Sequence, residues 1–179
     1  MRLHGKGGSG SGTYQSGDVT IVQPNGNASG WGGRQWLYFA PSSYASAVGP
    51  IIAAVDAAGC GQVIVNGFSN GGAMAMKLYC SGETFGGRLI GVVVDDPVPD
   101  HGADGCARPG GVDLTVYWTG ALEYPAQPGW NCAEQDWTCE GGTTVGIGAY
   151  AANAGVGAKA SPNSSHTWFT NAPETRAWR

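Results

Sequence analysis

One serine in the sequence has the surroundings of a catalytic nucleophile. The pentapeptide Gly-Phe-Ser-Asn-Gly at 67–71 fits the pattern G-x-S-x-G, in which a sharp turn between a strand and a helix exposes the serine hydroxyl. The apolar, β-branched run 63–65 predicts the strand, and the good helix formers at 73–79 predict the helix. We therefore interpret Ser69 as a candidate nucleophile. The alternative is a glycine turn that carries an ordinary solvated serine.

A serine nucleophile needs a base to take its proton and an acidic group to orient that base. The chain offers three histidines for the first role, at positions 4, 101 and 166. Carboxylates that follow the serine offer the second role, at Asp95 and Asp96, at Glu123 and at Asp136. The residues alone leave all of these candidates open.

Apolar runs and turn residues predict the elements that must position these groups. The strand predicted at 18–24, an amphipathic helix at 44–58 and the strand before Ser69 form one β-α-β unit, which favours a parallel sheet. Further along the chain we predict strands at 89–97 and 114–120, a helix at 143–153, a short strand at 158–160 and a loop at 163–169.

The segment 28–41 is rich in glycine and aromatic residues, which predicts an excursion at the surface. Its aromatic side chains, among them Trp31, Trp36 and Tyr38, could line a pocket for an acyl group or a sugar. Packing over the sheet is the use that we favour for most of them.

Composition limits the classes of function. The length of 179 residues suits one domain over 1–179, and the net charge of -4 without a basic stripe argues against nucleic acid as a partner. No apolar segment approaches the ~20 residues that cross a bilayer. The histidines and cysteines show no zinc-like spacing, so we expect no metal and no cofactor. We expect a monomer.

Five cysteines in a chain of this length favour an oxidising compartment, and their odd number leaves at least one thiol unpaired in a monomer. Cys60, Cys80 and Cys106 could give one bridge and one free thiol. The first residues lack the apolar centre of a signal peptide, so a leader has been removed, the protein is exported by another route, or it stays inside the cell. We expect a secreted or extracellular protein.

Taken together, the motifs resemble those of compact α/β-hydrolases. The chain is similar to minimal lipases in its size and in the H-G-x-G-G loop at 4–8, and to cutinase-type serine esterases in the pentapeptide 67–71. The C-x-x-x-D-x-x-C arrangement at 132–139 is a second similarity to cutinases. The resemblance implies a minimal α/β-hydrolase fold, with a mostly parallel sheet of about five to six strands and helices on both faces.

The resemblance also implies roles for particular residues. In α/β-hydrolases the triad follows the order serine, acid, histidine, which selects His166 as the base. The H-G-x-G-G loop supplies one N–H group of the oxyanion hole and the residue after the serine supplies the other, which implies Lys6 and Asn70. A flexible Gly/Ser leader is the alternative interpretation of the first residues.

The acid of the triad has three candidates. Cutinases carry their aspartate in a small disulfide loop, so the resemblance implies Asp136 between bridged Cys132 and Cys139, and this is our preferred choice. Glu123 lies just beyond a predicted strand, another customary position for the acid. The pair Asp95 and Asp96 ends the preceding strand, a less common position.

We therefore expect a serine esterase that acts on carboxylic esters with short or medium acyl chains, or on a polyester, through a Ser-His-Asp triad and an acyl-enzyme. The substrate partner is thus a small or polymeric ester. An inactive hydrolase scaffold that binds carbohydrate or cell-wall polymer is the alternative from another class. An acyltransferase or a thioesterase is a further enzymatic alternative.

Overall fold

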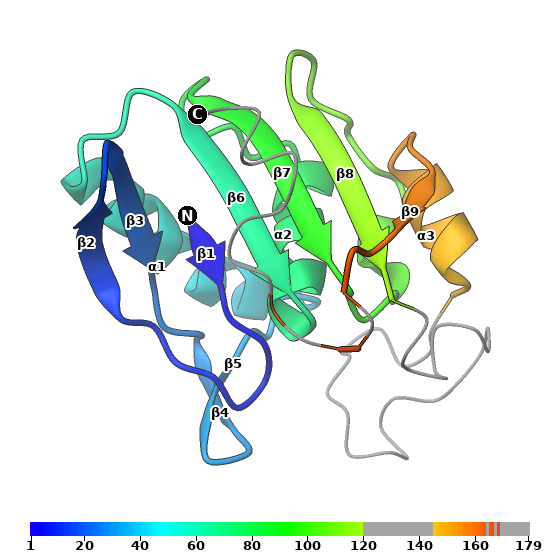
Figure 1. Ribbon diagram of the computed structural model, residues 1–179, viewed down its shortest axis with the longest axis horizontal. Helices are drawn as coiled ribbons and strands as arrows, with labels where there is room; N and C mark the ends of the chain where they lie inside the picture. The colour runs from blue at the N-terminus through cyan, green and yellow to red at the C-terminus, as the bar shows by residue number, and fades with distance from the viewer. Residues whose placement is uncertain (120–144, 164, 167, 169–179) are drawn as a thin grey trace.

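The computed structural model describes residues 1–119, 145–163, 165, 166 and 168. Its central feature is a five-stranded sheet, in the order β1-β6-β7-β8-β9, in which all neighbouring strands are parallel (Figure 1). Its strands are β1 (Arg2–Leu3), β6 (Val63–Phe68), β7 (Leu89–Asp95), β8 (Asp113–Trp118) and β9 (Ala158–Ala160). The α/β class and the parallel sheet predicted from the apolar runs are confirmed.

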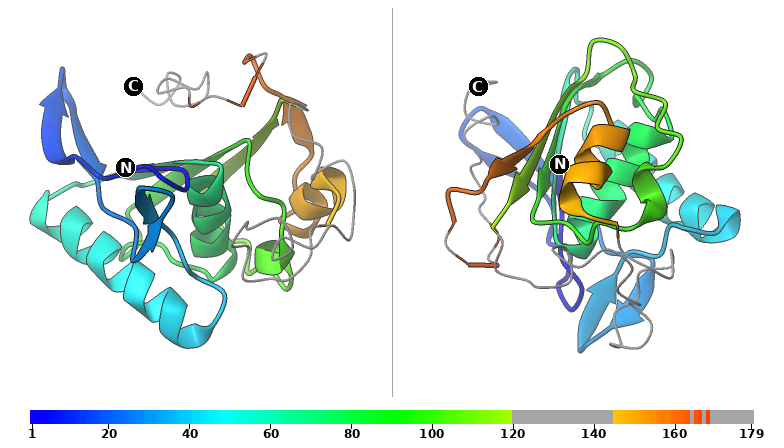
Figure 2. Two further views of the ribbon diagram at one scale, coloured as in Figure 1. Left: turned by 90° about the horizontal axis from the view of Figure 1, so that it is seen from below. Right: turned by 90° about the vertical axis from the view of Figure 1, so that its right-hand side faces the viewer.

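Three α-helices accompany the sheet: α1 (Pro41–Ala57), α2 (Asn70–Cys80) and α3 (Ile147–Asn153), with a short 3-10 helix, η1 (His101–Ala103). Figure 2 shows α1, α2 and α3 on one face of the sheet, so the described residues do not provide the predicted helices on both faces. Within these residues, no helix combines the length and the apolar character that a membrane span requires.

The predicted β-α-β unit is wrong at its first strand. β3 (Val19–Gln23) pairs in antiparallel fashion with β2 (Gly12–Ser16), in a hairpin outside the central sheet. Ser16 faces Val19, which leaves a two-residue turn at 17–18, and Gly17 adopts a left-handed φ of 60° there. The neighbours of β6 in the sheet are β1 and β7 instead. A second hairpin, β4 (Ala28–Gly30) with β5 (Gly33–Gln35), forms part of the predicted surface excursion.

The hydrophobic core lies between the sheet and the helices. Trp36 and Tyr38 follow β5 and are each only 1% exposed, so packing is the use of these two aromatic side chains, whereas Trp31 is 54% exposed. The largest other fully buried side chains of the core are Leu3, Ile51, Val55, Val65, Met74, Met76, Leu78, Phe85 and Tyr150. The aromatic pair therefore joins the segment after β5 to the same core as α2.

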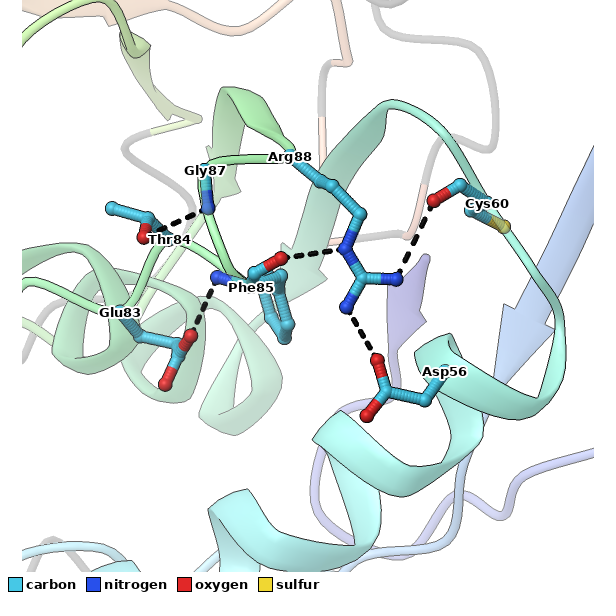
Figure 3. Close-up of polar contacts among 7 residues, drawn as sticks. All are labelled: Asp56, Cys60, Glu83, Thr84, Phe85, Gly87 and Arg88. Carbon is cyan, nitrogen blue, oxygen red and sulfur yellow. Dashed lines mark hydrogen bonds and ion pairs between the residues drawn. The ribbon is translucent and has the colours of Figure 1, made fainter.

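A loop held by one arginine leads into β7 (Figure 3). The Arg88 guanidinium pairs with the Asp56 carboxylate near the end of α1 and donates to the carbonyls of Phe85 (2.6 Å) and Cys60 (3.5 Å). These contacts fasten the start of β7 to the end of α1. They fix the strand whose far end carries Asp95 and Asp96.

One disulfide joins Cys80, at the end of α2, to Cys106, beyond η1, while Cys60 is a free thiol. This confirms the prediction of one bridge and one free thiol among these three cysteines. The predicted bridge between Cys132 and Cys139 lies outside the described residues.

Candidate active site

Ser69 occupies the predicted turn between β6 and α2, with a left-handed φ of 53° and a ψ of -120°. Glycines on both sides are required for steric reasons. A Cβ on Gly67 would lie 2.1 Å from the carbonyl oxygen of Gly71, and one on Gly71 would lie 2.2 Å from that of Leu3. The Ser69 N–H donates to the carbonyl of Asp95 at 2.9 Å. The strand, turn and helix are confirmed, and the serine conformation is the strained one expected at a nucleophile elbow.

His166 is paired with Asp96. The distance from His166 Nδ1 to Asp96 Oδ2 is 2.5 Å. Asp96 is fully buried, and Thr119 donates to it twice, from its backbone N–H to Oδ1 (3.0 Å) and from its hydroxyl to Oδ2 (2.8 Å). Asp96 also has a left-handed φ of 44°, and its N–H donates to the carbonyl of Tyr117 at 3.0 Å. Thr119 therefore fixes both oxygens of the carboxylate, and one of these oxygens also contacts the imidazole.

The same imidazole lies beside the serine turn. The centroid of its ring is 4.5 Å from that of Phe68, the residue immediately before Ser69, and Phe68 also stacks against Trp168 at 6.1 Å. A carboxylate can only accept a hydrogen bond, so with Asp96 as a carboxylate Nδ1 of His166 is the donor, and a neutral ring in this tautomer has its lone pair on Nε2. This is the tautomer that a general base for serine requires.

The glycine-rich loop at 4–8 lies against the turn. A Cβ on Gly5 would be 3.3 Å from Cβ of Ser69. The loop closes on itself through the Gly8 N–H, which donates to the Gly5 carbonyl at 3.0 Å, and the Gly7 N–H donates to the carbonyl of Arg34 in β5 at 2.9 Å. The loop thus lies beside the serine turn. The donation by the backbone N–H groups of Lys6 and Asn70 to an oxyanion stays a prediction.

His4 supports this loop and is not a candidate base. Its buried ring contacts the carbonyl of Gly5 through Nδ1 (2.8 Å), and its Nε2 accepts from the N–H of Gly26 (3.1 Å). The pKa of His4 lies below its usual value, mainly because the ring is buried. The hydrogen bond to Gly5 partly raises the pKa, and the charge of Arg34 lowers it. A neutral ring that donates from Nδ1 and accepts at Nε2 satisfies both contacts. The third histidine, His101, pairs on the surface with Asp104.

A small hollow of about 260 Å³ adjoins the turn. It is lined by His4, Gly5, Lys6, Gly8, Ser9, Phe68 and Trp168. A larger hollow of about 570 Å³ lies between the hairpin β2–β3 and the start of β6, and its lining includes no residue of the glycine-rich loop at 4–8 and not Phe68. We take the smaller hollow as the candidate substrate site, because its lining includes Phe68, the residue before Ser69, and the glycine-rich loop, although neither Ser69 nor His166 lines it.

Comparison of the chain with models of protein families, with curated proteins and with solved structures finds no match. Interpretation of the site therefore depends on its own geometry. In the part of the chain that the structure describes, no group of three or more His, Cys, Asp and Glu side chains is arranged to hold a metal ion.

The predicted acids divide into two sets. Asp136 and Glu123 lie outside the described residues. Of the adjacent pair, Asp96 contacts His166, while Asp95 contributes its backbone carbonyl to the N–H of Ser69. Sequence reasoning missed Thr119 altogether, although its place just past β8 was a usable signal, since functional polar groups gather at the carboxyl ends of parallel strands.

Proposed function

We propose that this protein is a serine esterase with the α/β-hydrolase fold that its motifs resemble. Ser69 is the nucleophile, His166 the general base and Asp96 the acid that orients the base. The observation that carries the proposal is the 2.5 Å contact of His166 Nδ1 with Asp96 Oδ2, made beside a serine in a strained left-handed turn. Two buried residues with positive φ, at the ends of neighbouring strands, support a site built for chemistry.

The proposed reaction has two halves. The Ser69 oxygen attacks the ester carbonyl carbon while its proton passes to Nε2 of His166, and the intermediate then expels the alcohol, which takes that proton. Water attacks the acyl-enzyme next, again losing a proton to His166. Cleavage of the acyl bond returns the proton to Ser69 and releases the carboxylic acid. Ester and water thus give acid and alcohol.

The developing oxyanion is stabilised by the N–H groups of Lys6 and Asn70. Asn70 is the first residue of α2, where N–H groups lack intrahelical acceptors and the helix dipole favours negative charge. A Cβ added to Gly5 would lie 3.3 Å from Cβ of Ser69, and this closeness of the loop to the turn supports a contribution by Lys6. Donors aimed at the oxyanion are commonly the largest single contribution to acyl-transfer catalysis.

The small hollow supports esters with short or medium acyl chains, or an ester at the end of a polymer, as substrates. The disulfide between Cys80 and Cys106 supports an oxidising, extracellular setting, where such bonds persist. We propose that the protein works as a secreted monomer.

A fluorophosphonate probe with mass spectrometry tests the proposal. We expect one adduct, on Ser69, and hydrolysis of p-nitrophenyl butyrate that Ser69→Ala abolishes. Ser16→Ala, on the exposed strand β2, is the matched control and should keep both properties. Parent-level hydrolysis by Ser69→Ala would refute the nucleophile. A parent protein that gives neither adduct nor hydrolysis would favour the inactive binding scaffold.

A further inference from the structure

The side chain of Asn70 binds the main chain of Trp36. Its Oδ1 accepts from the Trp36 N–H at 2.7 Å, and its Nδ2 donates to the Trp36 carbonyl at 3.0 Å. Both residues are buried, with 3% and 1% of their surface exposed. The Asn70 carboxamide thus pairs with both the N–H and the carbonyl of Trp36, as the main chain of an adjacent β-strand would. The segment after β5 is thereby locked to the first residue of α2.

The side chain of Trp36 extends the connection to the glycine-rich loop. Its indole N–H donates to the carbonyl of His4 at 3.0 Å, and the two rings lie 5.3 Å apart. His4 in turn contacts the carbonyl of Gly5 through its own ring. Trp36 is therefore hydrogen-bonded at one end to the residue after the nucleophile and at the other to the residue that precedes Gly5 and Lys6.

We propose that Trp36 is a positioning residue that sets the separation of the two oxyanion donors, the N–H groups of Lys6 and Asn70. The inference depends on the proposed function, because it assigns Trp36 a role in that same site. Trp36 acts only through other residues. Its indole orients the His4 carbonyl and so the peptide units that follow, while its backbone holds the Asn70 side chain.

The strict geometry of an oxyanion hole makes the catalytic rate sensitive to contacts that set the spacing of the two donors. Both donors must come within about 2.7–3.1 Å of the same oxygen, and a displacement of about 1 Å lowers rates about 10²-fold. The two donors lie on separate segments, a loop at 4–8 and the start of α2, which are 64 residues apart in sequence from Lys6 to Asn70. Their relative position is therefore set by tertiary contacts such as those of Trp36.

Two replacements of Trp36 test the inference. Trp36→Phe removes the indole N–H and part of the ring, and incorporation of β-(3-benzothienyl)alanine at position 36 removes only the donor while keeping the shape. We expect kcat for p-nitrophenyl butyrate to fall about 10-fold or more, with KM within about 3-fold of the parent. A rise in KM with unchanged kcat would contradict the assignment.

Tyr38→Phe is the matched control. Tyr38 lies two residues away, is equally buried and also donates one buried hydrogen bond, to Asp100. We expect a comparable drop in Tm with kcat unchanged. If the Trp36 and Tyr38 variants lower kcat alike, Trp36 is only a packing residue.

Amide hydrogen exchange tests the coupling without any substrate. The benzothienyl protein should exchange the amides of 5–8 faster than the parent, and Tyr38→Phe should not. Unchanged exchange would overturn the inference even in an active enzyme. Absence of a phosphonate adduct on the parent would overturn the proposed function separately.

Discussion

Replacement of Asp96 by Asn distinguishes the acid that we propose because of its contact with His166 from the acid implied by the cutinase resemblance. The new carboxamide oxygen can still accept from the backbone N–H of Thr119, as Oδ1 does now. Its NH₂ group then replaces the oxygen that faces His166 Nδ1 and cannot accept a proton from it. The imidazole must then accept at Nδ1 and carry its proton on Nε2. In that tautomer it cannot take the proton of Ser69.

The size of the effect follows from the burial of this contact. Asp96 is fully buried, so water cannot replace its carboxylate as the partner of His166. Loss of the correct tautomer in a Ser-His-Asp triad lowers kcat about 10⁴-fold. We expect Asp96→Asn to lower kcat about 10³- to 10⁴-fold, which corresponds to about 4–5 kcal/mol of transition-state stabilisation. KM should change little if Asp96 does not contact the ester.

Steady-state hydrolysis of p-nitrophenyl butyrate measures this loss, with Asp136→Asn and Glu123→Gln assayed in parallel. Asp96→Asn is nearly isosteric, and thermal unfolding checks that it folds. We expect the other two variants to stay within about 10-fold of the parent. Asp96→Asn at near-parental kcat beside a large loss in Asp136→Asn would refute the assignment and restore the cutinase-like acid.

Three further outcomes concern stability. Burial is the main cause that raises the pKa of Asp100 from 3.8 to about 6, so the stability from its protonated form is complete below pH 3.8 and is lost as pH rises through about 6. Relative to Asp100→Asn, the parent should lose about 3 kcal/mol between pH 3.5 and 7.5 in urea unfolding; a flat difference would contradict this. Arg88→Ala should lower the free energy of unfolding by about 1–3 kcal/mol because two carbonyls lose their donor. Asp56→Ala, at a carboxylate that is 55% exposed, should lower it by under about 1 kcal/mol. Equal losses for the two variants in urea unfolding would count against the carbonyl contacts. Ser69→Gly should have a higher Tm than Ser69→Ala, since glycine adopts a positive φ without the cost of about 1 kcal/mol that a Cβ brings. The reverse order of Tm by calorimetry would contradict strain at the turn.

The central strands were predictable because their signals are local. The apolar residues 63–65 begin β6, and β7 is apolar along nearly its whole length, as a strand buried on both faces of a sheet requires. The turn at Ser69 was predictable because glycines flank it at positions where any Cβ would collide with backbone. Positions with such steric demands can only be glycine, so the sequence itself shows them.

Pairing partners were harder to predict. The run at 18–24 has strand-like residues, yet β3 pairs with β2, whose five residues are all exposed and carry little apolar signal. The Gly-Asp dipeptide at 17–18 was the available cue, since a two-residue loop with glycine first favours a hairpin. A preference for β-α-β units outweighed that cue.

The choice among the candidate acids could not be made from the sequence for a different reason. Sequence order limited the candidates to a few carboxylates, and Asp96 was among them, but order contains no distances. The contact with His166 joins residues 70 positions apart and depends on the path of the chain after β9. The resemblance to cutinases favoured Asp136 on a motif that the described contacts do not include.

Ser69 and Asp96 share one construction. Each is the first residue after a strand and itself has a left-handed φ. Each donates its N–H to a carbonyl near the end of the neighbouring strand, at Asp95 and Tyr117 respectively. A non-glycine residue in this conformation costs about 1–2 kcal/mol, and it persists only where surrounding bonds determine it. The ladder β6–β7–β8 supplies those bonds. The proposed nucleophile and the proposed orienting carboxylate are thus fixed by sheet register, whereas His166 belongs to the segment that follows β9.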